Sequence, residues 1–396
     1  MRTSRVASLI AAGAISLPLL ASTTSPVAVS PRTMPLPGTQ LAELKGSDTV
    51  AQDDFGYPVA VSGTTAVVGA PGHSEVAGRA YVFARTAAGW KQAAELSGSD
   101  TIAGDAFGYS VAVSGATAVV GAPIHGDAGS AYVFTKIAGR WKQVAELEGS
   151  GTVIQNEFGY SVAISGRTVI VGAPFAASDA LLAGQVYVFT ETATGWRQTA
   201  ELEGSGTIGG DQFGVSVAIS ARTVIVGANY RAQSQGRAYV FTETATGWRQ
   251  TTELKSSNGG NLSGDEFGSS VAISGTTVVV SAVGAHRAYI FTKKASDWKG
   301  VAEMTGADTT ASDYFGDSVA ISGTTVVVGA PLHLAGRAYL FTKTANGWKQ
   351  IAELEGSDVG HTSSEFGYSV AVSGRTVVVG APGRATFAGR AYVFEA

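Results

Sequence analysis

The 396-residue sequence contains no cysteine and little charge. Without cysteine the chain forms neither disulfide bonds nor thiolate metal sites, and a cysteine nucleophile is excluded. Charged residues are 15% of the sequence, against roughly 25% in an average protein. The formal net charge is -4 and no basic cluster is present, so a nucleic-acid partner is not expected.

Glycine and apolar residues are plentiful instead. Glycine accounts for 52 residues and hydrophobic residues for 45% of the chain, so the chain can bury a large core and is not a disordered segment. Many small residues with few charges indicate short strands joined by tight turns.

The N-terminus has the pattern of an export signal. Two arginines precede an apolar run at residues 6–21, and polar residues follow it. The run is interrupted by Pro18 and is shorter than the ~20 residues that span a bilayer. We therefore predict a signal peptide at residues 1–30, cleaved between 21 and 30, and a proline-rich linker at 31–38. An extracellular, secreted protein without membrane insertion is expected.

One motif recurs seven times, and this repetition is the dominant feature of the sequence. Phe-Gly begins at residues 55, 107, 158, 213, 267, 315 and 366. After twelve further residues comes Gly-Ala-Pro or a close relative, beginning at 69, 121, 172, 227, 281, 329 and 380. That interval is constant while the rest of the repeat varies in length, which is typical of a duplicated structural unit.

The second copy shows how the unit folds. Residues 107–114 alternate bulky and small side chains, which predicts a strand, and a Ser-Gly hairpin turn follows it. Residues 117–122 are apolar on both faces and predict a buried strand. Residues 131–135 and 141–147 predict a third strand and a partly solvated outer strand. Each copy should thus form four antiparallel strands, with bulky side chains nesting against small ones of the next copy.

The two ends of the chain complement each other. The seventh copy stops before its fourth strand, whereas residues 40–48 match a fourth strand (92–100) with no first three. We predict an all-β fold for residues 39–396: a seven-bladed β-propeller of four-stranded antiparallel blades, closed as a ring by the N-terminal strand.

The repeated pair Phe-Gly and Gly-Ala-Pro resembles the FG-GAP repeats of the integrin α-subunit propeller, and more closely those of bacterial secreted FG-GAP repeat proteins. The resemblance implies a binding or adhesion role through loops on one face. Some integrin repeats carry an acidic calcium loop between the two motifs. Here the intervening residues hold no acid except Asp317, so those calcium sites do not carry over, and neither a metal nor another cofactor is expected.

Candidate ligand-binding residues lie in loops of the predicted binding face. The histidines fall after Gly-Ala-Pro or before Phe-Gly, which places them on one face, although a duplicated, merely tolerated loop residue explains them more simply. The candidates are His73, His125, His286, His333 and His361, with Asp179 and Tyr230 from neighbouring loops.

Three further repeated residue types have structural explanations that we favour. Aspartates before Phe-Gly, such as Asp48 and Asp53, suit local turn hydrogen bonds better than a cation site. Arginines such as Arg79 could pair with these aspartates, within one blade or between blades. Tyrosines after Phe-Gly, such as Tyr57, could line the channel mouth for sugar stacking, but strand alternation favours packing against the next blade.

The function that these observations favour is a secreted, non-enzymatic, monomeric binding protein for a protein or glycan ligand. The loops at 71–78, 123–130, 174–184, 255–266 and 331–336 vary most and are the expected contact segments. One alternative is a secreted polysaccharide lyase or hydrolase with a cleft on the same face, and another is a self-associating structural surface protein. No catalytic residue is predicted, because no local group of nucleophile, base and orienting residue is present.

Overall fold

The computed structural model describes residues 35–176, 183–257, 264–295, 297–357 and 364–396. The chain divides into two units, Met1–Pro35 and Leu36–Ala396, and the second contains all the described strands. The predicted signal peptide, most of the predicted linker, and the candidates Asp179 and His361 lie outside the described residues.

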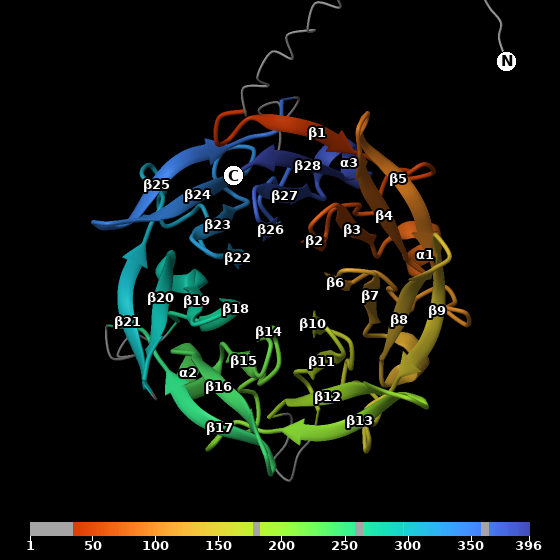
Figure 1. Ribbon diagram of the computed structural model, residues 1–396, viewed down its shortest axis with the longest axis horizontal. Helices are drawn as coiled ribbons and strands as arrows, with labels where there is room; N and C mark the ends of the chain where they lie inside the picture. The colour runs from red at the N-terminus through yellow and green to blue at the C-terminus, as the bar shows by residue number, and fades with distance from the viewer. Residues whose placement is uncertain (1–34, 177–182, 258–263, 296, 358–363) are drawn as a thin grey trace, which may run out of the picture. The chain divides into compact units, whose positions relative to one another are not determined.

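The second unit is a seven-bladed β-propeller (Figure 1). Seven four-stranded antiparallel sheets surround a central axis; six follow chain order from the axis outward, and in the seventh the outermost strand is β1. Blades 1 to 4 comprise β2 (Val59–Ser62), β3 (Thr65–Ala70), β4 (Arg79–Thr86), β5 (Gly89–Leu96); β6 (Ser110–Ser114), β7 (Thr117–Ala122), β8 (Ser130–Ile137), β9 (Arg140–Leu147); β10 (Ser161–Ser165), β11 (Thr168–Ala173), β12 (Gln185–Thr192), β13 (Gly195–Leu202); and β14 (Val217–Ser220), β15 (Thr223–Ala228), β16 (Arg237–Thr244), β17 (Gly247–Leu254).

Blades 5 to 7 complete the ring. They comprise β18 (Phe267–Ser274), β19 (Thr277–Ala282), β20 (Arg287–Lys294), β21 (Asp297–Met304); β22 (Val319–Ser322), β23 (Thr325–Ala330), β24 (Arg337–Thr344), β25 (Gly347–Leu354); and β26 (Ser369–Ser373), β27 (Thr376–Ala381), β28 (Arg390–Glu395) with β1 (Gln40–Leu44). Short helical turns connect second to third strands: α1 (His73–Val76), η1 (His125–Asp127), α2 (Arg231–Ser234), η2 (Val283–Ala285) and α3 (Arg384–Phe387). Among the described residues, no helix is long and apolar enough to span a membrane.

Ring closure by the N-terminal strand is confirmed. β1 pairs antiparallel with β28, with Leu44 opposite Ala391. Leu44 is buried in a core cluster that joins blade 7 to blade 1. The outer edge of blade 7 is therefore covered by the start of the propeller unit, which removes an exposed strand edge.

The first strand of most blades starts later than predicted. β6 begins at Ser110, not at Phe107, because Gly108 adopts φ +92° and the chain turns before it enters the sheet. Phe107 itself is fully buried between blades 1 and 2. Its ring meets those of Tyr132 and Phe134 at centroid distances of 5.5 and 6.0 Å. The phenylalanine of the Phe-Gly motif therefore supplies the expected packing between neighbouring blades.

The two glycines of the repeat permit close backbone contact between blades. A Cβ on Gly121 would lie 2.0 Å from the carbonyl oxygen of Gly159 in blade 3, and a Cβ on Gly108 would lie 2.2 Å from the carbonyl oxygen of Arg79 in blade 1. No side chain fits at either position. The constant interval between Phe-Gly and Gly-Ala-Pro thus places both glycines of a blade opposite the backbone of its neighbours.

A second set of interblade contacts lies at the opposite end of the inner strands, in the Ser-Gly hairpins. In every blade the hairpin serine hydroxyl accepts a backbone N–H from the next blade's hairpin, at 3.0 to 3.3 Å. The serines are Ser62, Ser114, Ser165, Ser220, Ser274, Ser322 and Ser373. The chain of hydrogen bonds closes on itself. We call this end of the propeller the hairpin face, and the end that carries the Phe-Gly turns the loop face.

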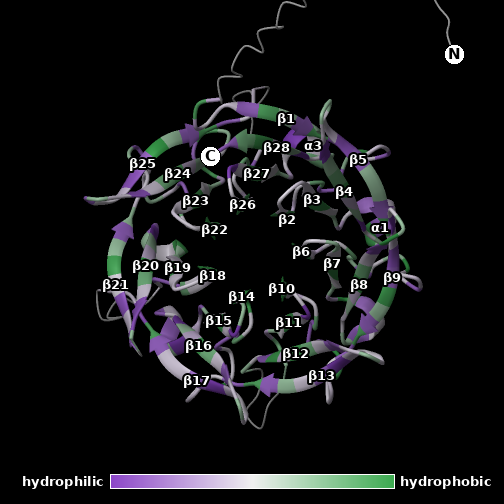
Figure 2. Ribbon diagram, viewed as in Figure 1, coloured by the Kyte–Doolittle hydropathy of each residue, from purple (hydrophilic) through white to green (hydrophobic). Residues whose placement is uncertain are grey.

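The outer strands are partly exposed to solvent, as predicted. Exposed and half-buried residues alternate along β5 and β9, and Figure 2 shows hydrophilic segments along the outermost strands. The second strands, such as β7, are almost entirely buried. The hydrophobic core therefore lies between the blades, around their second and third strands.

Candidate functional site

The channel mouth on the loop face is the first candidate site. It is a cavity of about 340 Å³ in which residues from the start of all seven blades meet. The residue that follows each Phe-Gly lines it: Tyr57, Tyr109, Tyr160, Val215, Ser269, Asp317 and Tyr368. Each of these stands where the chain enters its innermost strand, so seven equivalent positions point to the axis.

Four tyrosines form a continuous aromatic arc on one side of this mouth. Tyr57 lies 4.8 Å from Tyr368 and 5.1 Å from Tyr109, and Tyr109 lies 5.1 Å from Tyr160, measured between ring centroids. All four are half-buried. The interpretation that they pack with Phe in the core between blades is wrong, because the Phe-Gly turn rotates them toward the axis and Phe alone enters that core.

One carboxylate, that of Asp317, lines the mouth, and further carboxylates lie close enough to affect it. Burial, and secondly the carboxylate of Glu365, raises the pKa of Asp317 to about 7. Burial, followed by Glu365 and Asp53, raises the pKa of Asp54 to about 6. These acids from blades 6, 7 and 1 influence one another, so the mouth concentrates negative charge in a partly desolvated place.

The residue before each Phe belongs to the same feature. It is in the left-handed backbone region in all seven blades, with φ between 54° and 57°. The residues are Asp54, Ala106, Glu157, Gln212, Glu266, Tyr314 and Glu365. Four of them are acidic, and burial raises the pKa of each of the three glutamates. These acids were not singled out from the sequence, although each directly precedes the phenylalanine of a Phe-Gly motif and could have been recognised there.

Beneath the mouth the channel becomes apolar. A second cavity of about 220 Å³ is lined by valine, alanine and isoleucine from the inner strands. Neither cavity has a lysine or an arginine in its described lining. The arrangement can therefore take up a cationic group with an apolar stem, because aromatic faces and carboxylates both attract positive charge.

The four described histidines lie in separate blades and do not form one patch. Instead, three of them pair with the aspartate two residues before Phe-Gly in their own blade. Nδ1 lies 2.8 or 2.9 Å from the carboxylate in His73–Asp53, His125–Asp105 and His333–Asp313.

The same aspartates also accept a backbone N–H from three residues earlier, as Asp105 does from Ile102 at 2.6 Å. The prediction of local turn hydrogen bonds is confirmed for these aspartates, but not for Asp48, whose carboxylate accepts the hydroxyl of Tyr81 at 2.7 Å. It was incomplete, because the histidine partners are brought in by the fold.

Two other candidates stand apart. His286 follows the shortened loop of blade 5 with φ +56°, and its Nδ1 is buried with no hydrogen-bond partner among the described residues. Tyr230 is 41% exposed at the start of α2, near enough to contribute to the raised pKa of Tyr160, which burial chiefly causes. The structure leaves the ligand-binding role of both untested.

The expected arginine–aspartate bridges do not form at the repeated arginine. Arg79 instead pairs with Glu95 on the neighbouring outer strand at 3.1 Å. The same pairing recurs in four more blades: Arg237–Glu253, Arg287–Glu303, Arg337–Glu353 and Arg390–Glu43. The antiparallel register places the glutamate beside the arginine, which a linear comparison of the repeats does not reveal.

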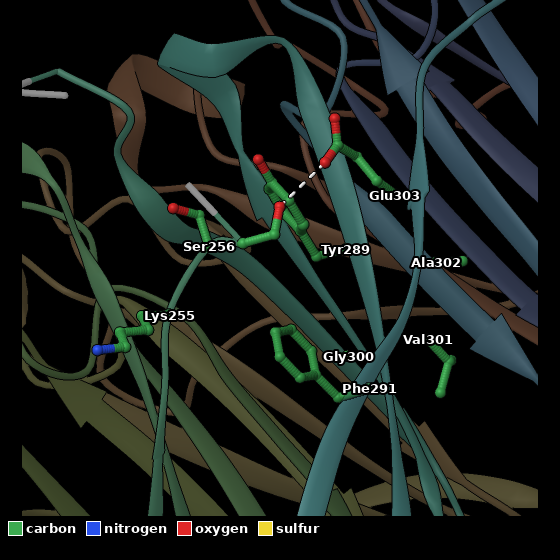
Figure 3. A pocket seen from close by; sticks show the side chains of 9 residues that line it. Lys255, Ser256, Tyr289, Phe291, Gly300, Val301, Ala302 and Glu303 are labelled. Carbon is green, nitrogen blue, oxygen red and sulfur yellow. Dashed lines mark hydrogen bonds between the residues drawn. The ribbon is translucent and has the colours of Figure 1, made fainter. Parts of the chain in front are cut away.

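Blade 5 contains a cavity of about 470 Å³ (Figure 3). In the other six blades an outer-strand glutamine accepts a backbone N–H from the loop of the preceding blade, as Gln92 does from Ser47 at 2.9 Å. Blade 5 has Gly300 at this position, and Gly300 lines the cavity together with Tyr289 and Phe291. The cavity is therefore explained by a missing side chain.

Solved structures confirm the architecture at low sequence identity. A chain in the crystal structure of a mitotic checkpoint complex is 11% identical, with a TM-score of 0.57 over 96% of this chain and 99% of that one. A putative 6-phosphogluconolactonase from Bacteroides uniformis is 12% identical, with a TM-score of 0.56 over 81% and 89%. These likenesses show the fold alone. No curated protein matches the sequence.

The family model of the FG-GAP repeat matches the chain seven times, at residues 39–83, 90–134, 141–189, 196–241, 248–291, 298–341 and 348–394. Each match begins near an outer strand and ends on the third strand of the next blade, so the repeat in sequence is offset from the blade in space. Such a propeller supports a binding or adhesion-type role in general terms. From seven matches along one closed ring of blades, we conclude that the chain belongs to the FG-GAP repeat family.

Proposed function

We propose that this chain is an exported, non-enzymatic binding protein whose channel mouth takes up a lysine or arginine side chain of a protein partner. The observation that carries the proposal is the convergence of four tyrosines with Asp317 in one cavity on the loop face. The export signal predicted at residues 1–30 supports the location outside the cell.

The dimensions and chemistry suit a single cationic side chain. About 340 Å³ is near the lower limit of small-molecule pockets, which run from roughly 300 to 1,000 Å³. A polysaccharide chain would need a longer groove. The tilted rings of Tyr57, Tyr109 and Tyr368, at 42° and 47°, form a cup around a charge and not a flat stacking surface.

The loops around the mouth would add specificity. They differ between blades in length and in their short helical turns, while all second strands have six residues. A protein partner would therefore insert one basic side chain and contact several loops at the rim, a division between a central anchor and a surrounding rim that is common in protein interfaces.

The test compares Nα-acetyl-lysine amide with its neutral isostere Nα-acetyl-norleucine amide, titrated by NMR into the full chain. We expect binding of the lysine compound only, weakened roughly tenfold or more by Asp317→Asn because a buried ion pair loses one partner. Affinity should also fall from pH 8 to pH 5, since protonation of a carboxyl with a pKa of about 7 removes its charge.

Two variants make the result specific. Tyr109→Phe should retain affinity because the aromatic face remains, whereas Tyr109→Leu should reduce it. Ser114→Ala, on the hairpin face, is the control and should leave affinity unchanged. Equal binding of both compounds, or binding of a neutral oligosaccharide in their place, would refute the proposal, and turnover of a glycan panel would favour the enzyme alternative.

A further inference from the structure

A second constellation lies in blade 2, at the outer part of the loop face. It combines His125 from η1, Asp100 from the loop before β6, and Glu146 from β9. Nε2 of His125 is 3.7 Å from a carboxylate oxygen of Asp100 and 3.7 Å from one of Glu146. One ligand atom from each of the three residues lies within 4.8 Å of the others.

Hydrogen bonds to neighbouring groups orient all three side chains. Nδ1 of His125 lies 2.8 Å from the buried carboxylate of Asp105, which fixes the tautomer that leaves a lone pair on Nε2. Tyr132 donates its hydroxyl to Asp100 at 2.9 Å, and Ser130 donates to Glu146 at 3.1 Å. In protein metal sites a ligand histidine commonly donates its second N–H to a carboxylate, and ligand carboxylates accept hydrogen bonds from neighbouring groups. The three side chains here have the same kind of support.

The distances favour an ion over direct contact. A separation of 3.7 Å is too long for a hydrogen bond between His125 and either carboxylate. By contrast, two ligand atoms that each lie about 2.0–2.2 Å from a tetrahedral zinc are roughly 3.4 Å apart. Three ligand atoms at such spacings require little movement to close around one ion.

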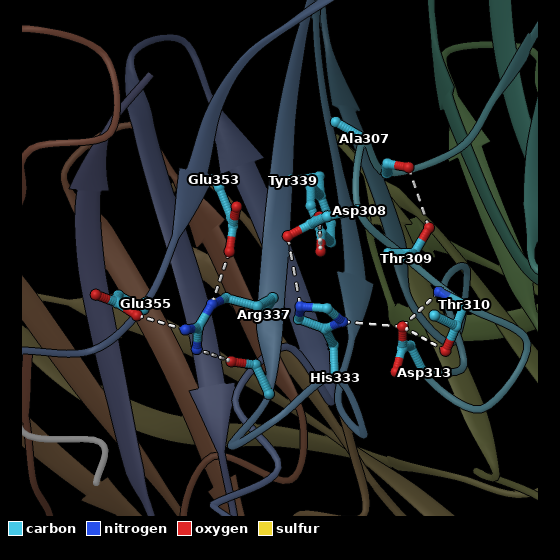
Figure 4. A network of polar contacts seen from close by, with 12 residues as sticks. Ala307, Asp308, Thr309, Thr310, Asp313, His333, Arg337, Tyr339, Glu353 and Glu355 are labelled. Atoms are coloured by element: carbon cyan, nitrogen blue, oxygen red, sulfur yellow. Dashed lines mark hydrogen bonds and ion pairs between the residues drawn. The ribbon is translucent and has the colours of Figure 1, made fainter. Parts of the chain in front are cut away.

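The equivalent residues of blade 6, Asp308, His333 and Glu353, also lie within 4.8 Å of one another, but blades 1 and 6 differ from blade 2 in one respect. There the glutamate is already neutralised by an arginine, as Glu353 is by Arg337 at 2.8 Å (Figure 4). Blade 2 has Ser130 where the other two have arginine. Within the described part of the chain, no lysine or arginine forms an ion pair with Asp100, Asp105 or Glu146.

A cavity lies beside the site and meets it at His125, whereas Asp100 and Glu146 are not part of its lining. This cavity, of about 200 Å³, is lined by His125, Ser130, Glu148 and Thr152, among others. An ion with three protein ligands keeps a fourth position open, and here that position would be reached from the cavity. The open position is what distinguishes a ligand-binding metal site from a purely structural one.

We propose that blade 2 binds one divalent transition-metal ion of the zinc class through His125 Nε2, Asp100 and Glu146, with a coordination position open to the adjacent cavity. The site is independent of the channel mouth. Imidazole with two carboxylates is a ligand set used by zinc, and His125, whose Nδ1 is held by Asp105, provides Nε2 as the nitrogen ligand when the ion replaces the proton there.

The experiment is titration of the metal-free full chain with Zn²⁺ by calorimetry, with Co²⁺ absorption as a report of coordination geometry. We expect one ion per chain and a tetrahedral or five-coordinate Co²⁺ spectrum. His125→Ala should weaken binding at least a hundredfold, whereas His333→Ala in blade 6 should leave it unchanged.

A reciprocal exchange tests the role of the arginine without touching a ligand. Ser130→Arg should abolish binding in blade 2 while the thermal unfolding curve stays cooperative, and Arg337→Ser should create a second site in blade 6. Absence of binding below 1 mM Zn²⁺ would overturn the proposal. So would equal binding by wild type and His125→Ala, or binding of Ca²⁺ in preference to Zn²⁺.

Discussion

The hairpin face and the loop face of the propeller are built from the same repeat, yet the first is uniform around the ring and the second varies between blades. On the hairpin face seven serine hydroxyls make the same hydrogen bond around the ring. On the loop face the equivalent positions hold tyrosine in four blades and valine, serine or aspartate in the others. One end therefore maintains the ring, while the other carries chemistry that changes from blade to blade.

The exceptions on each face support this contrast. Ala221 replaces the hairpin glycine of blade 4 and still adopts φ +51°, and its N–H keeps the bond to Ser165 at 3.1 Å. In blade 5, by contrast, the loop after β19 is shorter, and among the described residues neither Nδ1 of His286 nor Oδ2 of Asp265 has a hydrogen-bond partner. A substitution on the hairpin face preserves the contact, whereas one on the loop face changes the site.

The largest expected effect comes from opening the ring, on which both faces depend. Deleting residues 39–48 removes β1 and the buried Leu44, which exposes the outer edge of β28. We expect loss of a single cooperative unfolding transition, measured by circular dichroism or calorimetry. Deleting residues 22–34 is the control, and equal effects of the two deletions would contradict closure by β1.

The second prediction compares a glycine at each end of blade 2. Gly121→Ala places a Cβ 2.0 Å from the carbonyl of Gly159, and such overpacking costs about 1–3 kcal/mol of unfolding free energy, or more where only backbone can move. Gly115→Ala on the hairpin face meets no atom within 4 Å but keeps φ +58°, which costs roughly 1 kcal/mol. Denaturant unfolding measures both, and an equal or larger loss at Gly115 would show that close contact between blades is not decisive.

The smallest predicted change is a gain in stability at the channel mouth. The pKa of Asp317 rises on folding from 3.8 to about 7, so the folded state binds more protons than the unfolded state in this interval. Stability contributed by the protonated acid is then lost as the pH rises from 4 through 7. Asp317→Asn should raise the unfolding free energy by at least about 1 kcal/mol at pH 8, with a smaller gain at pH 4, where the folded state is protonated and the unfolded state is partly protonated.

Unfolding of this variant at the two pH values is the measurement. Ser269→Ala at the same ring of the mouth serves as an uncharged control and should show no pH-dependent difference. A loss of stability at pH 8 would mean that the Asp317 carboxylate is compensated in the fold. In that case the negative charge of Asp317 would already be balanced within the protein and would not attract the proposed cation.

Much of the fold could be predicted because its determinants are local and repeated. The period-two strands, the Ser-Gly turns and the constant interval between Phe-Gly and Gly-Ala-Pro each depend on residues close in sequence. The closing strand was legible as well, because residues 40–48 copy 92–100. The start of the first strand was misplaced, since the left-handed Gly108 is a feature of the backbone and not of hydrophobic pattern.

The candidate sites were predicted less well because they join residues from separate strands and blades. His125 and Glu146 are 21 residues apart in the chain, and only the loop after β7 and the register of β8 with β9 bring them together. The arginine–glutamate pairs were missed for the same reason. Tyr57 was placed by alternation, and alternation fails where the strand has not yet begun.

By itself the sequence determined the four-stranded unit, the number of blades and the closure of the ring, because the same local conformational preferences are repeated seven times along the chain. Only the tertiary structure decided what the loop face contains. Seven equivalent positions become neighbours there through curvature of the ring, so four tyrosines and Asp317 share one cavity although they are spread over more than three hundred residues. Such convergence depends on distances in space, and these are set by blade packing.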